Sequence, residues 1–114
     1  MATIFAQGDI LLERVSDVVP DPRAAVPRTD GLVVIAEGEL TGHRHSISEN
    51  LTFFRDDALA RDVPDPLYLG HLVVDAPSAD LVHQEHAPIT LLKGTYRVRR
   101  QRELAPADAW LVAD

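Results

Sequence analysis

Residues 43–53 read HRHSISENLTF, and the alternation in this stretch decides which side chains face the core. Successive side chains of a β-strand point to opposite faces of the sheet. The odd positions hold histidines, a glutamate and large apolar residues, whereas every even position is polar. The apolar members mark the odd face as the buried one. The sequence therefore predicts a strand at 43–49 whose His43, His45 and Glu49 side chains point into the core.

A buried imidazole or carboxylate costs free energy unless it is hydrogen-bonded or bound to a metal ion. Two histidines at i and i+2 of a strand have Cα atoms about 6.6 Å apart, because each residue adds ~3.3 Å. Their ring nitrogens can then converge on one ion at ~2.1 Å each. The spacing of His43 and His45, with Glu49 on the same face, predicts a divalent metal site inside the domain. The alternative is a set of hydrogen-bonded histidines in the core or at the surface.

The segment LVHQEHAPI, residues 81–89, supplies two further histidines. If Leu81 points into the core, His83 does so as well, and the turn expected before Pro88 returns His86 to the same point. One of these two residues, or both, completes the predicted site. The expected ligands are His43, His45, His83, His86 and Glu49, with Glu49 either on the metal or beside the ligands. His71 is expected at the surface or next to the ligands, because its strand has no clearly polar face.

Prolines and glycines cut the chain into short apolar runs, which is typical of strands joined by turns. A hairpin is expected at Lys93-Gly94, a proline-rich surface loop at 16–30, and one helical turn within 55–66. The pattern predicts an all-β domain, a small barrel or sandwich of eight or nine short strands with little helix. The expected strands are 9–15, 32–36, 43–49, 51–55, 67–75, 79–83, 89–92, 95–103 and 110–113.

The composition limits the function classes. A chain of 114 residues with 46% hydrophobic residues fits one globular domain, residues 1–114. The net charge of −7 disfavours nucleic acid as a partner, and no apolar run is long enough to span a membrane. A cytoplasmic location is the expectation. Because there is no cysteine, any metal must be bound through nitrogen and oxygen.

The segment YRVRRQRE contains four closely spaced arginines: Arg97, Arg99, Arg100 and Arg102. Exposed or salt-bridged charges on an edge strand explain them without a function, because such charges also hinder aggregation. The functional alternative is an anionic ligand or the acidic surface of a partner. Trp110 is expected to pack in the core or against a second copy of the chain.

The histidine stretch resembles the first motif of the cupin superfamily, a glycine followed by HxH and then a glutamate. Gly38, His43, His45 and Glu49 match that motif in order. The resemblance implies a small double-sheet barrel in which these histidines and this glutamate bind a metal, with a third histidine, His83 or His86, from later in the chain. The whole chain also resembles a group of short uncharacterised bacterial proteins with a QGD start, a GHxH middle and HxEH followed by GTYRVRRQRE. That likeness assigns no activity.

The sequence thus favours a small cupin-like protein that binds one divalent metal ion, with zinc, iron, manganese and nickel all compatible. Three protein ligands would leave the ion open to act on a small-molecule substrate, whereas a closed shell of ligands would make it structural. No catalytic residue is assigned, and enzyme and non-enzyme both stay open. The alternative function is a binding or assembly module that presents the arginine strand and the 16–30 loop to a partner. Exposed strand edges favour a homodimer in either case.

Overall fold

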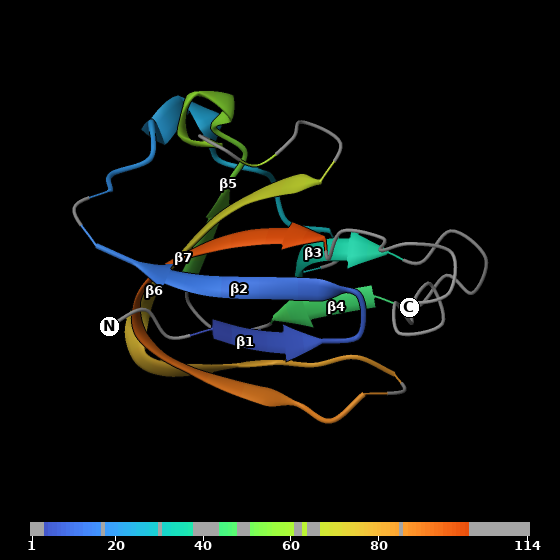
Figure 1. The fold of residues 1–114 in the computed structure, drawn as a ribbon. Helices are drawn as coiled ribbons and strands as arrows, with labels where there is room; N and C mark the ends of the chain where they lie inside the picture. The colour runs from blue at the N-terminus through green and yellow to red at the C-terminus, as the bar shows by residue number, and fades with distance from the viewer. Residues whose placement is uncertain are drawn as a thin grey trace, which may run out of the picture.

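The computed structural model describes residues 4–16, 18–29, 31–37, 44–47, 51–60, 63, 67–84 and 86–100 (Figure 1). Seven strands and two single-turn 3₁₀ helices lie within these ranges. The strands are β1 (Ile4–Gln7), β2 (Ile10–Val15), β3 (Val33–Glu37), β4 (Arg44–Ile47), β5 (Leu51–Phe54), β6 (Tyr68–Leu81) and β7 (Ile89–Arg100), and the helices are η1 (Pro22–Ala24) and η2 (Asp57–Leu59). The all-β class and the helical turn within 55–66 are confirmed.

The strands form a five-stranded sheet in the order β1-β2-β7-β6-β5 and a two-stranded sheet of β3 and β4. Every pairing is antiparallel. The predicted strands at 67–75 and 79–83 are one continuous strand, β6, and most of the predicted 89–92 and 95–103 lies in one strand, β7. The sequence suggested separate strands because Pro77 and Gly94 interrupt the apolar pattern.

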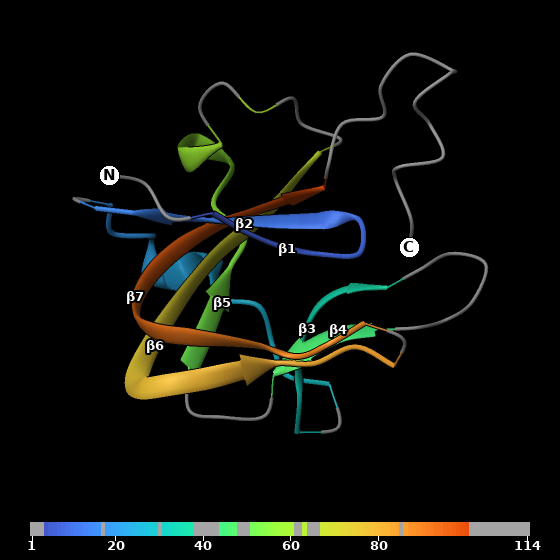
Figure 2. The same ribbon diagram turned by 60° about the horizontal axis from the view of Figure 1, so that its bottom comes forward.

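The predicted hairpin at Lys93-Gly94 is wrong, because Gly94 lies within the ladder and pairs with Val74. The next pair is Ser78 with Leu92, so Asp75–Pro77 of β6 oppose Lys93 alone and form a bulge. A bulge bends its strand, and a proline is tolerated there because it has no N–H to give to the ladder. Figure 2 shows both long strands turning sharply as they run from one half of the molecule to the other.

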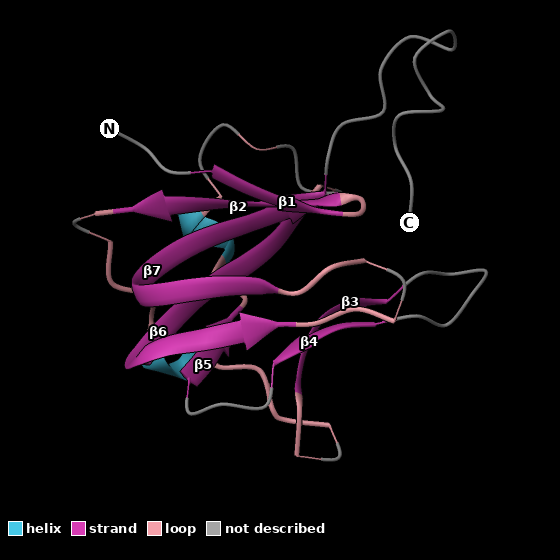
Figure 3. Cartoon of the chain, turned by 90° about the horizontal axis from the view of Figure 1, so that it is seen from below, coloured by secondary structure: helices cyan, strands magenta, loops and turns pink. Residues whose placement is uncertain are grey.

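The bend lets β6 and β7 take part in two layers. Their halves around 68–74 and 95–100 lie between β2 and β5, whereas the end of β6 continues toward β4. Ser46 and Val82 exchange two backbone hydrogen bonds of 3.0 Å, which join β3-β4 to the end of β6. Within the described ranges the strands thus form a two-layer sandwich that does not close into a barrel (Figure 3).

The core between the layers is built from both sheets. Its fully buried members include Leu12, Leu72 and Val98 from the five-stranded sheet and Ile47 from the smaller one. Leu51 and Phe53 are also buried, as the alternation predicts. Ser46 departs from it: this residue is buried although it lies on the polar face, because the backbone pairing with Val82 covers it.

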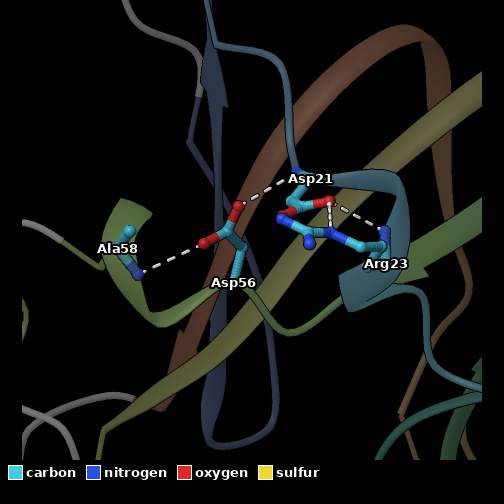
Figure 4. A network of polar contacts seen from close by, with 4 residues as sticks. All are labelled: Asp21, Arg23, Asp56 and Ala58. Atoms are coloured by element: carbon cyan, nitrogen blue, oxygen red, sulfur yellow. Dashed lines mark hydrogen bonds and ion pairs between the residues drawn. The ribbon is translucent and has the colours of Figure 1, made fainter.

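The 16–30 segment is held to the domain at several points. The backbone N–H of Asp21 donates to Asp56 Oδ2 at 3.0 Å, while Asp56 Oδ1 accepts from the N–H of Ala58 and caps η2 (Figure 4). Further along, Val26 N–H donates to the Phe53 carbonyl at 2.8 Å. The residues of the expected surface loop are therefore mostly exposed, but its backbone is hydrogen-bonded to β5 and to the segment after it.

The arginine strand is β7, which lies at the centre of the five-stranded sheet and not at an edge. Arg97 forms a 2.8 Å ion pair with Glu13 of β2, and Arg99 lies 3.8 Å from the same carboxylate. The salt-bridged interpretation of these two arginines is confirmed. Arg102, Trp110 and the predicted strand 110–113 lie outside the described residues. None of the helices in the described ranges could span a membrane.

Candidate metal centre

Three of the predicted ligands lie together at one end of the sandwich. The ring centroids of His45 and His83 are 4.4 Å apart, those of His83 and His86 are 4.5 Å apart, and those of His45 and His86 are 6.4 Å apart. His45 is fully buried and His83 is 9% exposed. His43 and Glu49, the other two members of the predicted set, lie outside the described residues.

The pairing of Ser46 with Val82 explains why His45 and His83 meet. In an antiparallel bridge, the residue before one partner faces the residue after the other, so position 45 stands opposite position 83. Residues opposite each other share a face and have their Cβ atoms about 5 Å apart. The inward face of β4 therefore brings the His45 ring directly against the His83 ring.

His86 returns to the same place through the turn that connects β6 to β7. The backbone N–H of His86 donates to the Nδ1 atom of His83 at 3.3 Å, which closes the turn locally. Gly8 lies on the other side of the ring: a Cβ atom at Gly8 would come within 2.8 Å of His86 Nε2 and within 3.3 Å of His45 Cε1. The rings thus contact the backbone of the β1–β2 turn, where Gly8 has a φ of +58°.

Gln7, the last residue of β1, fixes the orientation of His45. Its side-chain amide donates to the carbonyls of Leu81 and Ala87, at 2.9 Å each. Because a carbonyl only accepts, the amide nitrogen must face these two groups and the amide oxygen must face away from them. That oxygen lies 2.8 Å from His45 Nδ1, which therefore donates to it and carries a proton.

Asp9 faces the other nitrogen of His45. Its Oδ1 atom lies 3.4 Å from His45 Nε2, and its Oδ2 atom accepts a short hydrogen bond from Arg100. Burial alone would raise the pKa of Asp9, but His45 and Arg100 together hold that pKa below its ordinary value. Asp9 Oδ1 and His45 Nε2 are buried, and neither atom has a hydrogen-bond partner within the described part of the chain.

The histidine and aspartate side chains lie close together, but their arrangement in this structure does not enclose a metal ion. Among the described residues, no group of three or more histidine, aspartate or glutamate side chains is arranged to hold a metal as it stands. The structure nevertheless adds Gln7, Gly8, Asp9 and Arg100 to the surroundings of the predicted histidines. The sequence signal for Gln7, Gly8 and Asp9 was the QGD start, and Arg100 belongs to the arginine segment YRVRRQRE.

His71 is not part of this cluster, and its expected place at the surface or beside the ligands is wrong. It is 2% exposed and lies on β6 next to Tyr68, at a ring-centroid distance of 5.6 Å. The Tyr68 hydroxyl donates to the Asp56 carbonyl at 3.0 Å and is 2.8 Å from His71 Nδ1. A hydroxyl has one proton to donate, so His71 Nδ1–H donates to the tyrosine oxygen.

The fold and this end of the molecule define a small all-β domain with a histidine and aspartate cluster between its two layers. The chain belongs to the family described as Domain of unknown function (DUF8820), whose model matches residues 6–101. That match includes every residue of the cluster. No curated protein and no solved structure gives a significant match to the chain.

Proposed function

We propose that this protein binds one divalent metal ion through His45, His83 and His86, with His43 and Glu49 as further ligands. The observation that carries the proposal is the meeting of three imidazole rings from two distant parts of the chain. Imidazoles packed against one another away from water need a shared reason to be there, and a cation supplies it. The cupin-like order of Gly38, His43, His45 and Glu49 supports the same role.

The ring spacing suits a single ion. Rings that bind one ion at ~2.1 Å place their centroids roughly 5 Å apart. The observed separations of 4.4, 4.5 and 6.4 Å bracket that value. Rotation of the rings, together with an adjustment of the turn that carries His83 and His86, would bring the nitrogens to a common point.

His83 is the ligand that must change most. Its Nδ1 atom accepts from the backbone N–H of His86, so the neutral ring carries its proton on Nε2. To bind a metal through Nε2, the ring has to change tautomer, so that its single proton lies on Nδ1 and not on Nε2. The bond that must break is 3.3 Å long and therefore weak. Metal binding is thus expected to reorganise the turn between β6 and β7.

The bound ion would supply Lewis-acid or redox chemistry if positions remain open to a small molecule, and folding stability if the protein closes its coordination shell. Nitrogen and oxygen donors suit zinc, iron, manganese or nickel. The chain itself contributes a buried site at one end of the core, where a hydrogen bond to Gln7 orients His45. We favour a small molecule as the substrate, because the rings lie between two layers and not on an open face.

The experiment measures metal content in protein purified without an affinity tag, together with melting curves with and without EDTA. We expect about one equivalent of metal and a lower Tm after chelation, because a ligand at 100 times its Kd stabilises a protein by about 2.7 kcal/mol. His45→Ala and His86→Ala should both lose the metal. His86 is only half buried, so that variant should still fold.

His71→Ala is the matched control, since it removes a buried histidine that lies outside the cluster. It should lose stability but keep its metal. Protein that never contains metal, and that melts identically in zinc and in EDTA, would refute the proposal. The assembly module is then the remaining candidate, although Arg97 and Arg100 already pair with Glu13 and Asp9 inside the domain.

A further inference from the structure

The turn between β1 and β2 belongs to the cluster, although the predicted ligands do not include it. Gln7 and Ile10 are paired at the ends of the two strands, so Gly8 and Asp9 form a two-residue hairpin loop. Gly8 provides the positive φ that such tight turns need. The result is that Gln7 and Asp9 reach the two opposite nitrogens of the same ring, His45.

The contacts of Gln7 determine which nitrogen of His45 is a donor. The two carbonyls of Leu81 and Ala87 fix the amide, and the amide oxygen then requires a proton on His45 Nδ1. A neutral imidazole has only one N–H, so its Nε2 atom carries a lone pair. That lone pair points toward the Asp9 carboxylate, 3.4 Å away.

When His45 is neutral, two electron-rich atoms face each other in a buried place, and they repel unless a positive charge, a second proton on the ring or a metal ion, lies between them. His45 is fully buried, and its Nε2 atom and Asp9 Oδ1 have no hydrogen-bond partner within the residues that the structure describes. The hydrogen bond from Arg100 goes to the other carboxylate oxygen, Oδ2. The arrangement leaves Oδ1 and Nε2 as a pair of donors to a cation, one oxygen and one nitrogen.

We propose that the Gln7-Gly8-Asp9 turn is a working part of the metal centre. Asp9 supplies an oxygen ligand through Oδ1, and Gln7 is a positioning residue that keeps the proton of His45 on Nδ1. Arg100 holds Asp9 Oδ2 and thereby turns Oδ1 toward the rings. The role of Asp9 rests on the proposed metal binding, whereas the role of Gln7 is a property of the metal-free protein and stands without it.

The test of Gln7 uses long-range proton–nitrogen correlation spectra of metal-free protein at about pH 9, where ordinary histidines are neutral. The His45 ring of the wild type should show the Nδ1–H tautomer. Gln7→Met should lose that preference, while Gln84→Met, the same change at an exposed position of the chain, should keep it. A ring that carries its proton on Nε2 in the wild type, or that stays doubly protonated, would overturn the proposal.

If Gln7→Met fails to fold, the wild-type spectrum still tests the proposal, because a proton on Nε2 of His45 would overturn it. If the variant folds and the tautomer is unchanged, Gln7 is not the positioning residue. A merely structural glutamine would shift the melting curve without moving the His45 nitrogen signals. The spectrum therefore separates the two roles.

The test of Asp9 measures zinc affinity by competition with a chromophoric chelator. Asp9→Asn keeps the shape of the side chain and should weaken zinc binding by 10-fold or more. Asp75→Asn is the control, since it removes an equal charge from an exposed position on β6. Equal affinity of wild type and Asp9→Asn would exclude Asp9 as a ligand. A wild type that binds no zinc would refute the metal proposal and the Asp9 role together, and it would leave the tautomer result untouched.

Discussion

A Cβ atom at Gly8 would lie 2.8 Å from the Nε2 atom of His86, so this glycine and this ring are in direct contact. The contact joins the β1–β2 turn to the turn between β6 and β7. Gly8 is needed for two reasons: its φ of +58° suits glycine, and any side chain would push into the rings. The two reasons can be separated by comparison with another glycine.

Gly8→Ala should therefore both destabilise the protein and disturb the cluster. Gly31 also has a positive φ, +78°, but apart from its chain neighbours no described residue has an atom within 4 Å of the place its Cβ would take. Each substitution should cost about 1 kcal/mol for the backbone conformation. Only Gly8→Ala should displace the His86 ring and weaken zinc binding, as read from imidazole signals and a zinc titration. Identical behaviour of the two variants would show that the Gly8 contact has no effect on the site.

Glu13→Gln should reveal how much the central ion pair contributes. Glu13 and Arg97 are 14–21% exposed, so removal of the carboxylate charge leaves a poorly hydrated guanidinium. We expect a loss of about 1 kcal/mol or more in urea unfolding. Asp57→Asn, which breaks a well-exposed pair with Arg55, should change stability by less than ~0.5 kcal/mol. A smaller effect at Glu13 than at Asp57 would contradict this ranking.

Both tyrosines of the chain should resist ionisation. Burial raises the pKa of Tyr68 and of Tyr96, and each hydroxyl donates to a backbone carbonyl. Because the folded pKa lies above the unfolded value of about 10, this contribution to stability is complete below pH 10 and is lost as the pH rises further. Near-ultraviolet titration of folded protein should show phenolate only above the pH at which an ordinary tyrosine ionises, about 10. Appearance of phenolate near pH 10 in folded protein would contradict it.

Gly70→Ala should be more disruptive than Gly8→Ala or Gly31→Ala. A Cβ there would lie 2.4 Å from the Phe54 carbonyl oxygen and 2.6 Å from Phe53 Cζ. Backbone cannot move aside as a flexible side chain can, so we expect a loss of about 3 kcal/mol or more. Chemical denaturation checks this with Gly31→Ala as the reference. A loss equal to that of Gly31→Ala would mean that β5 and β6 adjust freely.

The sequence was sufficient for the fold class and for the faces of the best-patterned segments. His45, Leu51 and Phe53 are buried as the alternation requires, because apolar burial fixes the register of a strand. The two long strands were divided in the prediction, since Pro77 and Gly94 read locally as breaks. Only the pairing of one strand with the other shows that a bulge absorbs them.

The site was predictable in part. His83 and His86 were expected near His45 from local patterns alone, and the rings do meet. Asp9 was missed because nothing in a hairpin turn reveals which distant strand end it will face. His71 was misplaced for a different reason: its side of β6 is covered, because Tyr68 packs against the ring and hydrogen-bonds to the Asp56 carbonyl.

The bulge at Asp75–Pro77 has a mechanical consequence for the centre. Asp9 stands on the turn of one layer, whereas His83 stands at the tip of the limb of β6 that enters the other layer. The curvature of the β6–β7 hairpin therefore sets the distance between the Asp9 carboxylate and the His83 imidazole. Changing the length of that bulge would retune the centre without altering any residue that touches it.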